Sequence, residues 1–194
     1  MKKVLIASNN KEKIRELNAM LSKYNIVGVG IYDYFGRDID IVEDGKTYLQ
    51  NAVKKATAMA EIVDIPVIAD DSGIEVEAMK GDLGVYSARF MKKHLQEIIN
   101  NVIINNCKRE KNYNCRYSAY IVIMYPDKSF SYGHGIMNGK IVTTPVGENG
   151  FAFDPIFFYE PLNKTIAQMT LEEKNTYSHR AIAIKQLEEF IKLL

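Results

Sequence analysis

The chain has 194 residues, 47% of them hydrophobic, which is enough to bury a core without a framework of disulfides. Its 25 basic and 24 acidic residues leave a net charge of +1, so the whole molecule exerts no strong attraction on nucleic acid, and any site for a polyanion has to be local. The two cysteines, Cys107 and Cys115, match no common zinc or redox spacing, and no segment approaches the roughly 20 apolar residues of a membrane span. We therefore expect one domain over residues 1–194, a cytoplasmic location, and neither a nucleic-acid nor a membrane partner.

Strands and helices alternate in the first part of the chain. Short apolar runs predict strands at residues 4–7, 26–29, 39–42, 67–69 and 74–76. Apolar residues at helical spacing predict a helix over residues 11–22. They also predict a second helix, which begins at the capping-box pair Thr47 and Gln50 and ends before Pro66.

The second part of the chain adds a hairpin. Residues 92–105 are expected to be helical, and residues 116–125 and 129–137 are expected to pair as a hairpin around Pro126. Ser178 is suited to N-cap a final helix. Early alternation followed by a late hairpin predicts an α/β protein with a mixed central β-sheet flanked by helices.

The first candidate site lies at a strand-to-helix junction, in the run Ser8-Asn9-Asn10-Lys11-Glu12-Lys13. Two lysines in the first turn of a helix oppose the helix dipole, and a phosphate bound at the free N–H groups would resolve that conflict. The alternative is that Ser8 or Asn10 simply caps the helix and that the lysines are solvated.

Acidic residues form the second candidate group. Asp70-Asp71-Ser72-Gly73 follows a buried strand, where we expect a tight turn, and Glu43 precedes the helix that carries Lys55. Carboxylates in such a place need a partner, and Mg²⁺ takes hard oxygen ligands. The alternatives are an ordinary charged turn at residues 70–73 and a solvated lysine at position 55.

The third group combines aromatic and basic residues. Two aromatics in Gly150-Phe151-Ala152-Phe153-Asp154-Pro155 could stack on a base, or they could be core residues beside a turn. Lys174 and the run Ser178-His179-Arg180 could bind a carbonyl or phosphate oxygen, or they could be a capped helix start with exposed basic residues. Together the three groups supply what a nucleoside triphosphate needs, namely cations for phosphates, carboxylates for a metal and aromatics for a base.

These segments, in this order from Ser8 to Arg180, resemble the inosine triphosphate pyrophosphatase family. The most specific parts of the resemblance are residues 69–73 with 84–89, residues 150–157, and residues 172–180. The resemblance implies two lobes with the active cleft between them. It also implies Mg²⁺-dependent attack of water on the α-phosphorus of deaminated purine nucleoside triphosphates (ITP, XTP and dITP), which yields a monophosphate and pyrophosphate and cleanses the nucleotide pool.

The resemblance also assigns roles to residues. Asp71, Lys13, Lys55 and Asp70 would be catalytic, and Glu43 and Asp71 would hold Mg²⁺. The residues implied to bind substrate are Ser8, Asn9, Asn10, Lys11, Glu12, Lys13, Ser72, Phe151, Ala152, Phe153, Asp154, Lys174, His179 and Arg180. Arg180 is a donor only, so it could satisfy a 6-keto oxygen but not the amino group of adenine.

The chain departs from the family pattern at four positions. Leu83 replaces a proline, Asn149 and Ala152 replace two glycines, and Phe153 replaces a tyrosine or tryptophan. Alanine adopts left-handed backbone angles poorly, so a positive φ at position 152 would change the geometry of the base loop.

Two other functions are compatible with parts of the pattern. The septum-inhibitor-like nucleotide pyrophosphatases act on other bases and match less well at Ser178-His179-Arg180. A non-catalytic nucleotide-binding module would have no need of the metal-binding pair Glu43 and Asp71 beside Lys13. The resemblance further implies a homodimer.

Overall fold

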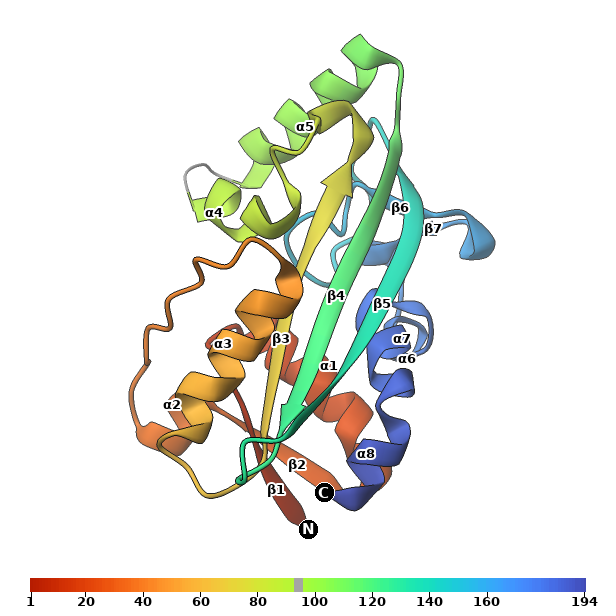
Figure 1. The fold of residues 1–194 in the computed structure, drawn as a ribbon. Coiled ribbons are helices and arrows are strands. Elements are labelled where there is room, and N and C mark those ends of the chain that lie inside the picture. Colours follow the sequence, from red (N-terminus) through yellow and green to blue (C-terminus); the bar gives the residue numbers. More distant parts are fainter. Residues whose placement is uncertain (93–95) are drawn as a thin grey trace. The chain divides into compact units, whose positions relative to one another are not determined.

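The computed structural model describes residues 1–92 and 96–194, and its strands form a seven-stranded sheet (Figure 1). The strands are β1 (Lys2–Ile6), β2 (Ile26–Gly30), β3 (Val67–Val76), β4 (Asn114–Met124), β5 (Phe130–Ile141), β6 (Phe157–Tyr159) and β7 (Lys164–Thr165). Their order across the sheet is β2-β1-β3-β4-β5-β6-β7. β1 is parallel to β2 and β3, whereas β6 is antiparallel to β5 and β7, so the predicted mixed sheet is confirmed.

The chain divides into two compact units. Unit 1 comprises residues 1–71, 119–135 and 179–194, and unit 2 comprises residues 72–118 and 136–178. The strands β3, β4 and β5 each contribute residues to both units. The single domain and the cleft between two lobes stay predictions.

In unit 1, helices cover both faces of the sheet (Figure 1). Successive side chains of a strand point to opposite faces. Val4 and Ile6 of β1 accordingly pack with α1 (Lys11–Leu21), α7 (His179–Gln186) and α8 (Glu188–Leu193), whereas Leu5 packs on the other face with α2 (Ile31–Phe35) and α3 (Tyr48–Ala60). Residues 67–71 of β3 are buried on both sides, so a charged residue there must find its partner within the protein.

Unit 2 has a core of its own, to which α5 (Gln96–Glu110) contributes Ile99 and Ile103. The helices α4 (Ser87–Lys92) and α6 (Leu171–Tyr177) also belong to this unit. Cys107 and Cys115 are free thiols in the core, and burial raises the pKa of Cys107 to about 11 and raises that of Cys115 as well.

Most predicted elements are present. The helix starts at the Asn10 and Thr47 caps and the hairpin of β4 and β5 agree with the sequence. The helix expected over residues 92–105 corresponds to α5 from Gln96 onward, and its residues 93–95 lie outside the described part of the chain. No helix within the described ranges is both long and apolar enough to cross a membrane.

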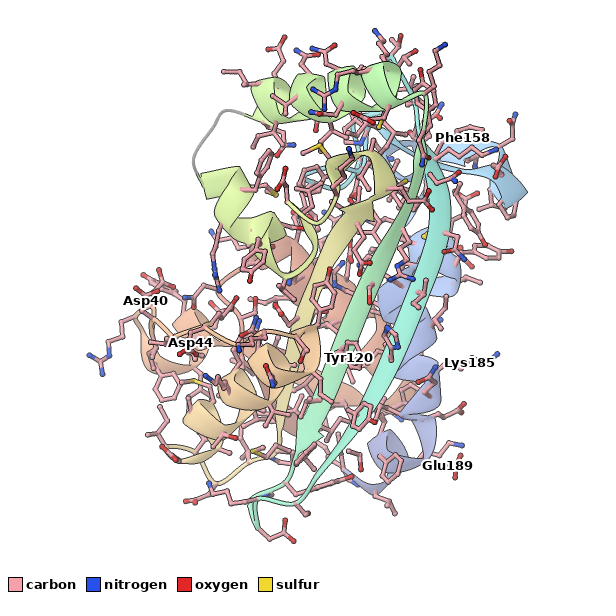
Figure 2. The ribbon with its side chains drawn as sticks, turned by 45° about the horizontal axis from the view of Figure 1, so that its top comes forward. Asp40, Asp44, Tyr120, Phe158, Lys185 and Glu189 are labelled. Atoms are coloured by element: carbon pink, nitrogen blue, oxygen red, sulfur yellow. The ribbon has the colours of Figure 1, made fainter. Side chains whose placement is uncertain are left out.

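The strand predicted at residues 39–42 is wrong, because this segment is a loop. Ile39 and Ile41 pack against the core of unit 1 without joining the sheet, while Asp38 and Asp40 stay in solvent. Figure 2 shows Asp40 and Asp44 on this loop, which connects α2 to α3. The alternation of apolar residues with aspartates therefore belongs to a loop here. Its apolar side chains pack on the core and its aspartates face solvent, without forming a strand.

Candidate functional site: two carboxylates on one strand

Asp70 and Asp71 lie in the interior of β3. The strands predicted at residues 67–69 and 74–76 are parts of one strand of ten residues, so the turn predicted at residues 70–73 is wrong. β3 lies between β1 and β4 in the sheet, and this position overrides the turn preference of the Asp-Asp-Ser-Gly run. Because neighbouring strand residues point to opposite faces, the two carboxylates meet different helices.

Asp70 faces the helices α1 and α7. Its Oδ2 lies 2.6 Å from Nζ of Lys13, and its Oδ1 lies 3.4 Å from Nε of Arg180. Asp70 is 1% exposed, and burial alone would raise its pKa, but the charges of Arg180 and Lys13 hold the pKa of this carboxyl well below its usual range. Asp70 is thus a buried anion between two cations.

Glu16 completes this side of the site. Its Oε2 accepts a hydrogen bond of 3.1 Å from Nη1 of Arg180, and both side chains are buried. Glu16 follows Lys13 by three residues on α1, so both can reach the same side of the helix. Glu16 is not among the predicted site residues, although its spacing of three residues from Lys13 is a signal that the two share a helix face.

Asp71 faces the helix α3. Nζ of Lys55 lies 3.3 Å from Oδ1 of Asp71 and 3.0 Å from Oε1 of Glu43, and it donates to the backbone oxygen of Asp70 at 2.7 Å. Burial raises the pKa of Asp71, with a further contribution from the charge of Glu43, in spite of the opposing effect of Lys55. Asp71 is therefore less fully compensated than Asp70.

Asn51 connects Asp71 to the loop that carries Glu43. Its Nδ2 donates to Oδ2 of Asp71 at 3.1 Å, and its Oδ1 accepts from the backbone N–H of Gly45 at 2.8 Å. The amide is 1% exposed, so this orientation is well fixed. The loop is also tied to α3 by the ion pair of Asp44 with Lys54 (Figure 2 labels Asp44).

The donor set fits a hard divalent cation. Glu43 and Asp71 both reach the same ammonium group of Lys55, so their oxygens converge on one point. The wider group holds three cationic side chains (Lys13, Lys55 and Arg180) and four anionic ones (Glu16, Glu43, Asp70 and Asp71), which leaves an excess of negative charge. Within the described residues no cluster of three or more possible ligands occurs, yet Mg²⁺ commonly uses one or two carboxylates together with substrate phosphates and water.

Residues in the segment Ser8–Lys13 differ in whether they cap the helix, face solvent or join the buried charge network. Oδ1 of Asn10 accepts from the backbone N–H groups of Glu12 and Lys13, so Asn10 is the helix cap. Asn9 and Lys11 are exposed, whereas Lys13 turns inward to Asp70, and burial lowers the pKa of its ammonium group. The two lysines are therefore different: Lys11 is free to meet a ligand from solvent, and Lys13 is part of the buried charge network.

In unit 2, Asp154 organises the predicted base loop. Its Oδ2 lies 2.9 Å from Nζ of Lys174 and accepts the backbone N–H of Phe151 at 3.0 Å. Nζ of Lys174 lies 5.7 Å from the centre of the Phe151 ring. Phe151 is half-buried, whereas Phe153 is 2% exposed and packs in the core, so Phe151 is the aromatic face that a base can reach.

Position 152 has the positive φ that alanine adopts poorly. Ala152 has a φ of 56°, in the left-handed region where a side chain is unfavourable. Gly147 and Gly150 in the same loop also have positive φ values, whereas Asn149 does not. The alanine therefore adopts the backbone that a glycine would adopt more easily.

The last group of predicted residues is distributed over both units. Lys174 is paired with Asp154 in unit 2, and Ser72 begins the unit-2 part of β3. His179 and Arg180 are buried in the first turn of α7 in unit 1. A Cβ atom added to Gly135 of β5 would lie 1.8 Å from the backbone oxygen of His179, so this glycine allows the start of α7 to lie directly on the sheet.

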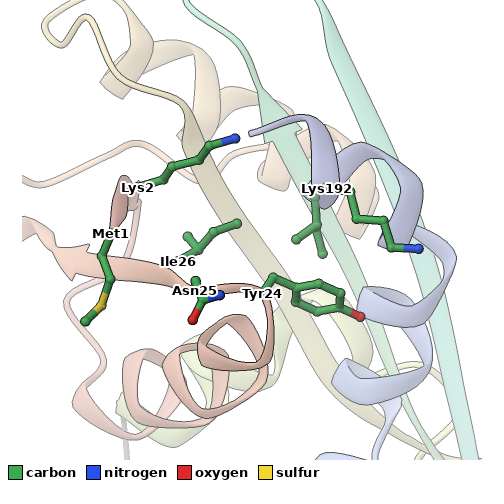
Figure 3. Close-up of a pocket in the computed structure, with 7 residues that line it drawn as sticks. Met1, Lys2, Tyr24, Asn25, Ile26 and Lys192 are labelled. Atoms are coloured by element: carbon green, nitrogen blue, oxygen red, sulfur yellow. The ribbon is translucent and has the colours of Figure 1, made fainter.

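A hollow of about 520 Å³ lies elsewhere in unit 1 (Figure 3). Its lining is Met1, Lys2, Tyr24, Asn25, Ile26, Ile191 and Lys192. None of these is a predicted site residue, and the charged network on β3 does not contribute to it.

The fold is that of an α/β protein, and the charged network on β3 is a candidate site for a cation and a polyanion. Residues 4–190 match the model of the Ham1 family, so the chain belongs to the Ham1 family. This finding confirms the predicted family.

Curated relatives and solved structures agree with the family. The dITP/XTP pyrophosphatase of Staphylococcus aureus strain MW2 is 35% identical over 99% of this chain and 97% of the relative. That of Lactiplantibacillus plantarum is 37% identical over 95% of this chain and 92% of the relative. The solved Staphylococcus aureus Ham1 protein is 34% identical, with a TM-score of 0.83 and 98% of each chain covered, and the HAM1 protein from Coxiella burnetii is 28% identical, with a TM-score of 0.84 and 100% of each chain covered. These matches confirm the predicted enzyme class, the hydrolases that act on acid anhydrides.

Proposed function

We propose that this protein hydrolyses deaminated purine nucleoside triphosphates (ITP, XTP and dITP) to the monophosphate and pyrophosphate in a Mg²⁺-dependent reaction, and so cleanses the nucleotide pool. The observation that carries the proposal is the pair Asp70 and Asp71, with one carboxylate saturated by cations and its neighbour left partly uncompensated. The names of the curated relatives support the substrate class.

Asp71 and Glu43 are the residues that would hold Mg²⁺, because their oxygens converge on one cationic point. When bound, Mg²⁺ supplies positive charge that neutralises phosphate oxygens. Asp71 would also orient or deprotonate the attacking water. Lys55 holds both carboxylates in place.

The reaction needs charge neutralisation more than covalent chemistry. The oxygen of water forms a bond to the α-phosphorus, the bond from that phosphorus to the bridging oxygen breaks, and pyrophosphate leaves with the negative charge. Lys13 and the exposed Lys11 supply positive charge for the phosphates. Asp70 keeps Lys13 and Arg180 at fixed positions.

Three residues would recognise the base: Phe151 by stacking, and Lys174 and Arg180 as hydrogen-bond donors. Phe151 offers a ring for stacking, and Lys174 lies beside that ring. Arg180 can donate to a 6-keto oxygen, because a guanidinium carries five N–H donors and no acceptor. Adenine presents an amino group to the same donors, and leaving a buried donor unpaired costs about 1–3 kcal/mol.

The test is a substrate panel in the presence of Mg²⁺. ITP, XTP, dITP, GTP, ATP and the pyrimidine triphosphates are incubated with the protein, and pyrophosphate, orthophosphate and monophosphate are measured separately. We expect turnover of ITP, XTP and dITP with pyrophosphate as the product. Turnover confined to pyrimidines would instead favour the septum-inhibitor-like activity, orthophosphate release would contradict attack at the α-phosphorus, and no turnover at all would refute the proposal.

A further inference from the structure

The carboxylate of Asp154 is held from three directions within unit 2. Lys174 and the backbone N–H of Phe151 both reach Oδ2, and the hydroxyl of Tyr117 donates to Oδ1 at 3.1 Å. Asp154 and Tyr117 are both buried, at 5% and 6% exposure. Donors on both oxygens fix the plane of the carboxylate as well as its position.

The loop that Asp154 holds is strained. Gly150 has a φ of 81°, Ala152 has a φ of 56°, and a Cβ atom on Gly150 would lie 2.0 Å from Oδ2 of Asp154. A left-handed alanine persists only where its surroundings fix it. Here the bond from Asp154 to the N–H of Phe151 spans that alanine, so a displaced carboxylate would release the loop.

The position of the Tyr117 hydroxyl is fixed by the surroundings of its ring. It lies on β4, and its ring stacks on Phe157 with 4.7 Å between ring centres and 23° between ring planes. The ring is therefore held by strand and core independently of the hydroxyl. Through its hydrogen bond to Asp154, the fixed hydroxyl restrains the carboxylate, and the carboxylate in turn restrains the loop.

We infer that Tyr117 is a positioning residue for base selection: through Asp154 it fixes the Phe151 ring and the Lys174 ammonium group in the geometry that receives the base. The inference rests on the function proposed above and deepens it. Lys174 and Phe151 touch the base, Asp154 holds both, and Tyr117 acts only through Asp154. Neither the sequence patterns nor the family resemblance pointed to Tyr117.

The test is Tyr117→Phe, which removes one hydroxyl and keeps the ring stack. The matched control is Tyr113→Phe in the same unit, where Tyr113 is half-buried and its hydroxyl has no hydrogen bond within the described residues. Loss of one buried hydrogen bond should lower kcat/KM for ITP about three- to tenfold, mainly through KM, and should weaken binding of inosine monophosphate by a similar factor in calorimetry. The ratio of ITP to GTP turnover should fall, whereas Tyr113→Phe should leave all three quantities unchanged.

The outcomes separate this inference from the proposed function. If Tyr117→Phe lowers only the melting temperature, or fails to fold, Tyr117 serves the stability of unit 2 and the inference is wrong. If the wild-type protein hydrolyses no triphosphate but binds inosine monophosphate more tightly than Tyr117→Phe does, the proposed function fails and the inference holds. If the wild-type protein neither hydrolyses nor binds these nucleotides, both are refuted.

Discussion

Replacing the two neighbouring aspartates of β3 one at a time should have opposite consequences. Asp70→Asn should destabilise the fold strongly, whereas Asp71→Asn should abolish activity with little effect on the fold. Both substitutions keep the size of the side chain and remove one charge. The difference between them therefore isolates what each charge does.

The cost at Asp70 follows from burial and pairing. Its carboxylate is 1% exposed and lies 2.6 Å from Lys13 and 3.4 Å from Arg180. Removing one partner from a buried charge network typically costs about 3–5 kcal/mol, because the remaining charges are left uncompensated. We expect Asp70→Asn to lose that amount of unfolding free energy.

Asp70 and Asp71 should affect the pH dependence of the unfolding free energy with opposite signs. The pKa of Asp70 is lowered in the folded state, so its contribution is present above the unfolded pKa of about 4 and is lost as the pH falls below that value. The pKa of Asp71 is raised, so its charge costs stability at neutral pH, and that cost disappears as the pH falls through the raised pKa. In metal-free protein, Asp71→Asn should cost less unfolding free energy than Asp70→Asn, because Lys55 keeps its ion pair with Glu43.

The assay is urea unfolding followed by circular dichroism in EDTA, combined with ITP turnover in Mg²⁺. Asp71→Asn should lose at least about 10²–10³-fold in kcat, by comparison with the loss of one preorganised charge in other active sites. Asp64→Asn, at an exposed position of unit 1, is the control and should match wild type in both measurements. Equal destabilisation by Asp70→Asn and Asp71→Asn, or near-normal turnover by Asp71→Asn, would refute the reasoning.

Three further predictions address packing, metal and assembly. Gly135→Ala should destabilise unit 1 by about 1–3 kcal/mol in urea unfolding, because the new Cβ would overlap the backbone oxygen of His179 and has no flexible neighbour to displace; an unchanged midpoint would contradict this. Removing divalent metal with EDTA should stop ITP turnover and added Mg²⁺ should restore it, while Glu43→Gln should raise the Mg²⁺ concentration needed for half-maximal rate. Light scattering should give twice the chain mass of 22.1 kDa, and a mass equal to one chain would exclude the expected homodimer.

Short stretches of sequence were sufficient to predict the helix starts and the hairpin, because neighbouring residues determine these features. The caps at Asn10 and Thr47 satisfy N–H groups of their own helices, so a few neighbouring residues specify where α1 and α3 begin. The hairpin of β4 and β5 follows from two alternating apolar runs around one turn. In these cases the partner of each residue is close in the sequence.

Prediction failed where the partner is distant. Asp70 and Asp71 favour a turn by local preference, but β3 continues through them because β1 and β4 lie on either side of it and because Lys13, Arg180 and Lys55 arrive from three helices. The family resemblance implied that only Asp71 of the two aspartates holds the metal, but it gave no physical cause for the difference. Glu16 and Tyr117 were missed for the same reason, since their importance depends on Arg180 and Asp154, which are remote in the chain.

The continuous strand explains why adjacent aspartates can have different roles. In a turn both carboxylates would be solvated, and neither pKa would move far. On a helix, neighbours are about 100° apart and would share the same compensating cations. In a buried strand they point in opposite directions, so α1 and α7 can saturate Asp70 while α3 offers Asp71 a single lysine that it shares with Glu43. An undercompensated, desolvated carboxylate gains the most from a divalent cation, so the proposed Mg²⁺ would have its largest effect on the energy of the site at Asp71.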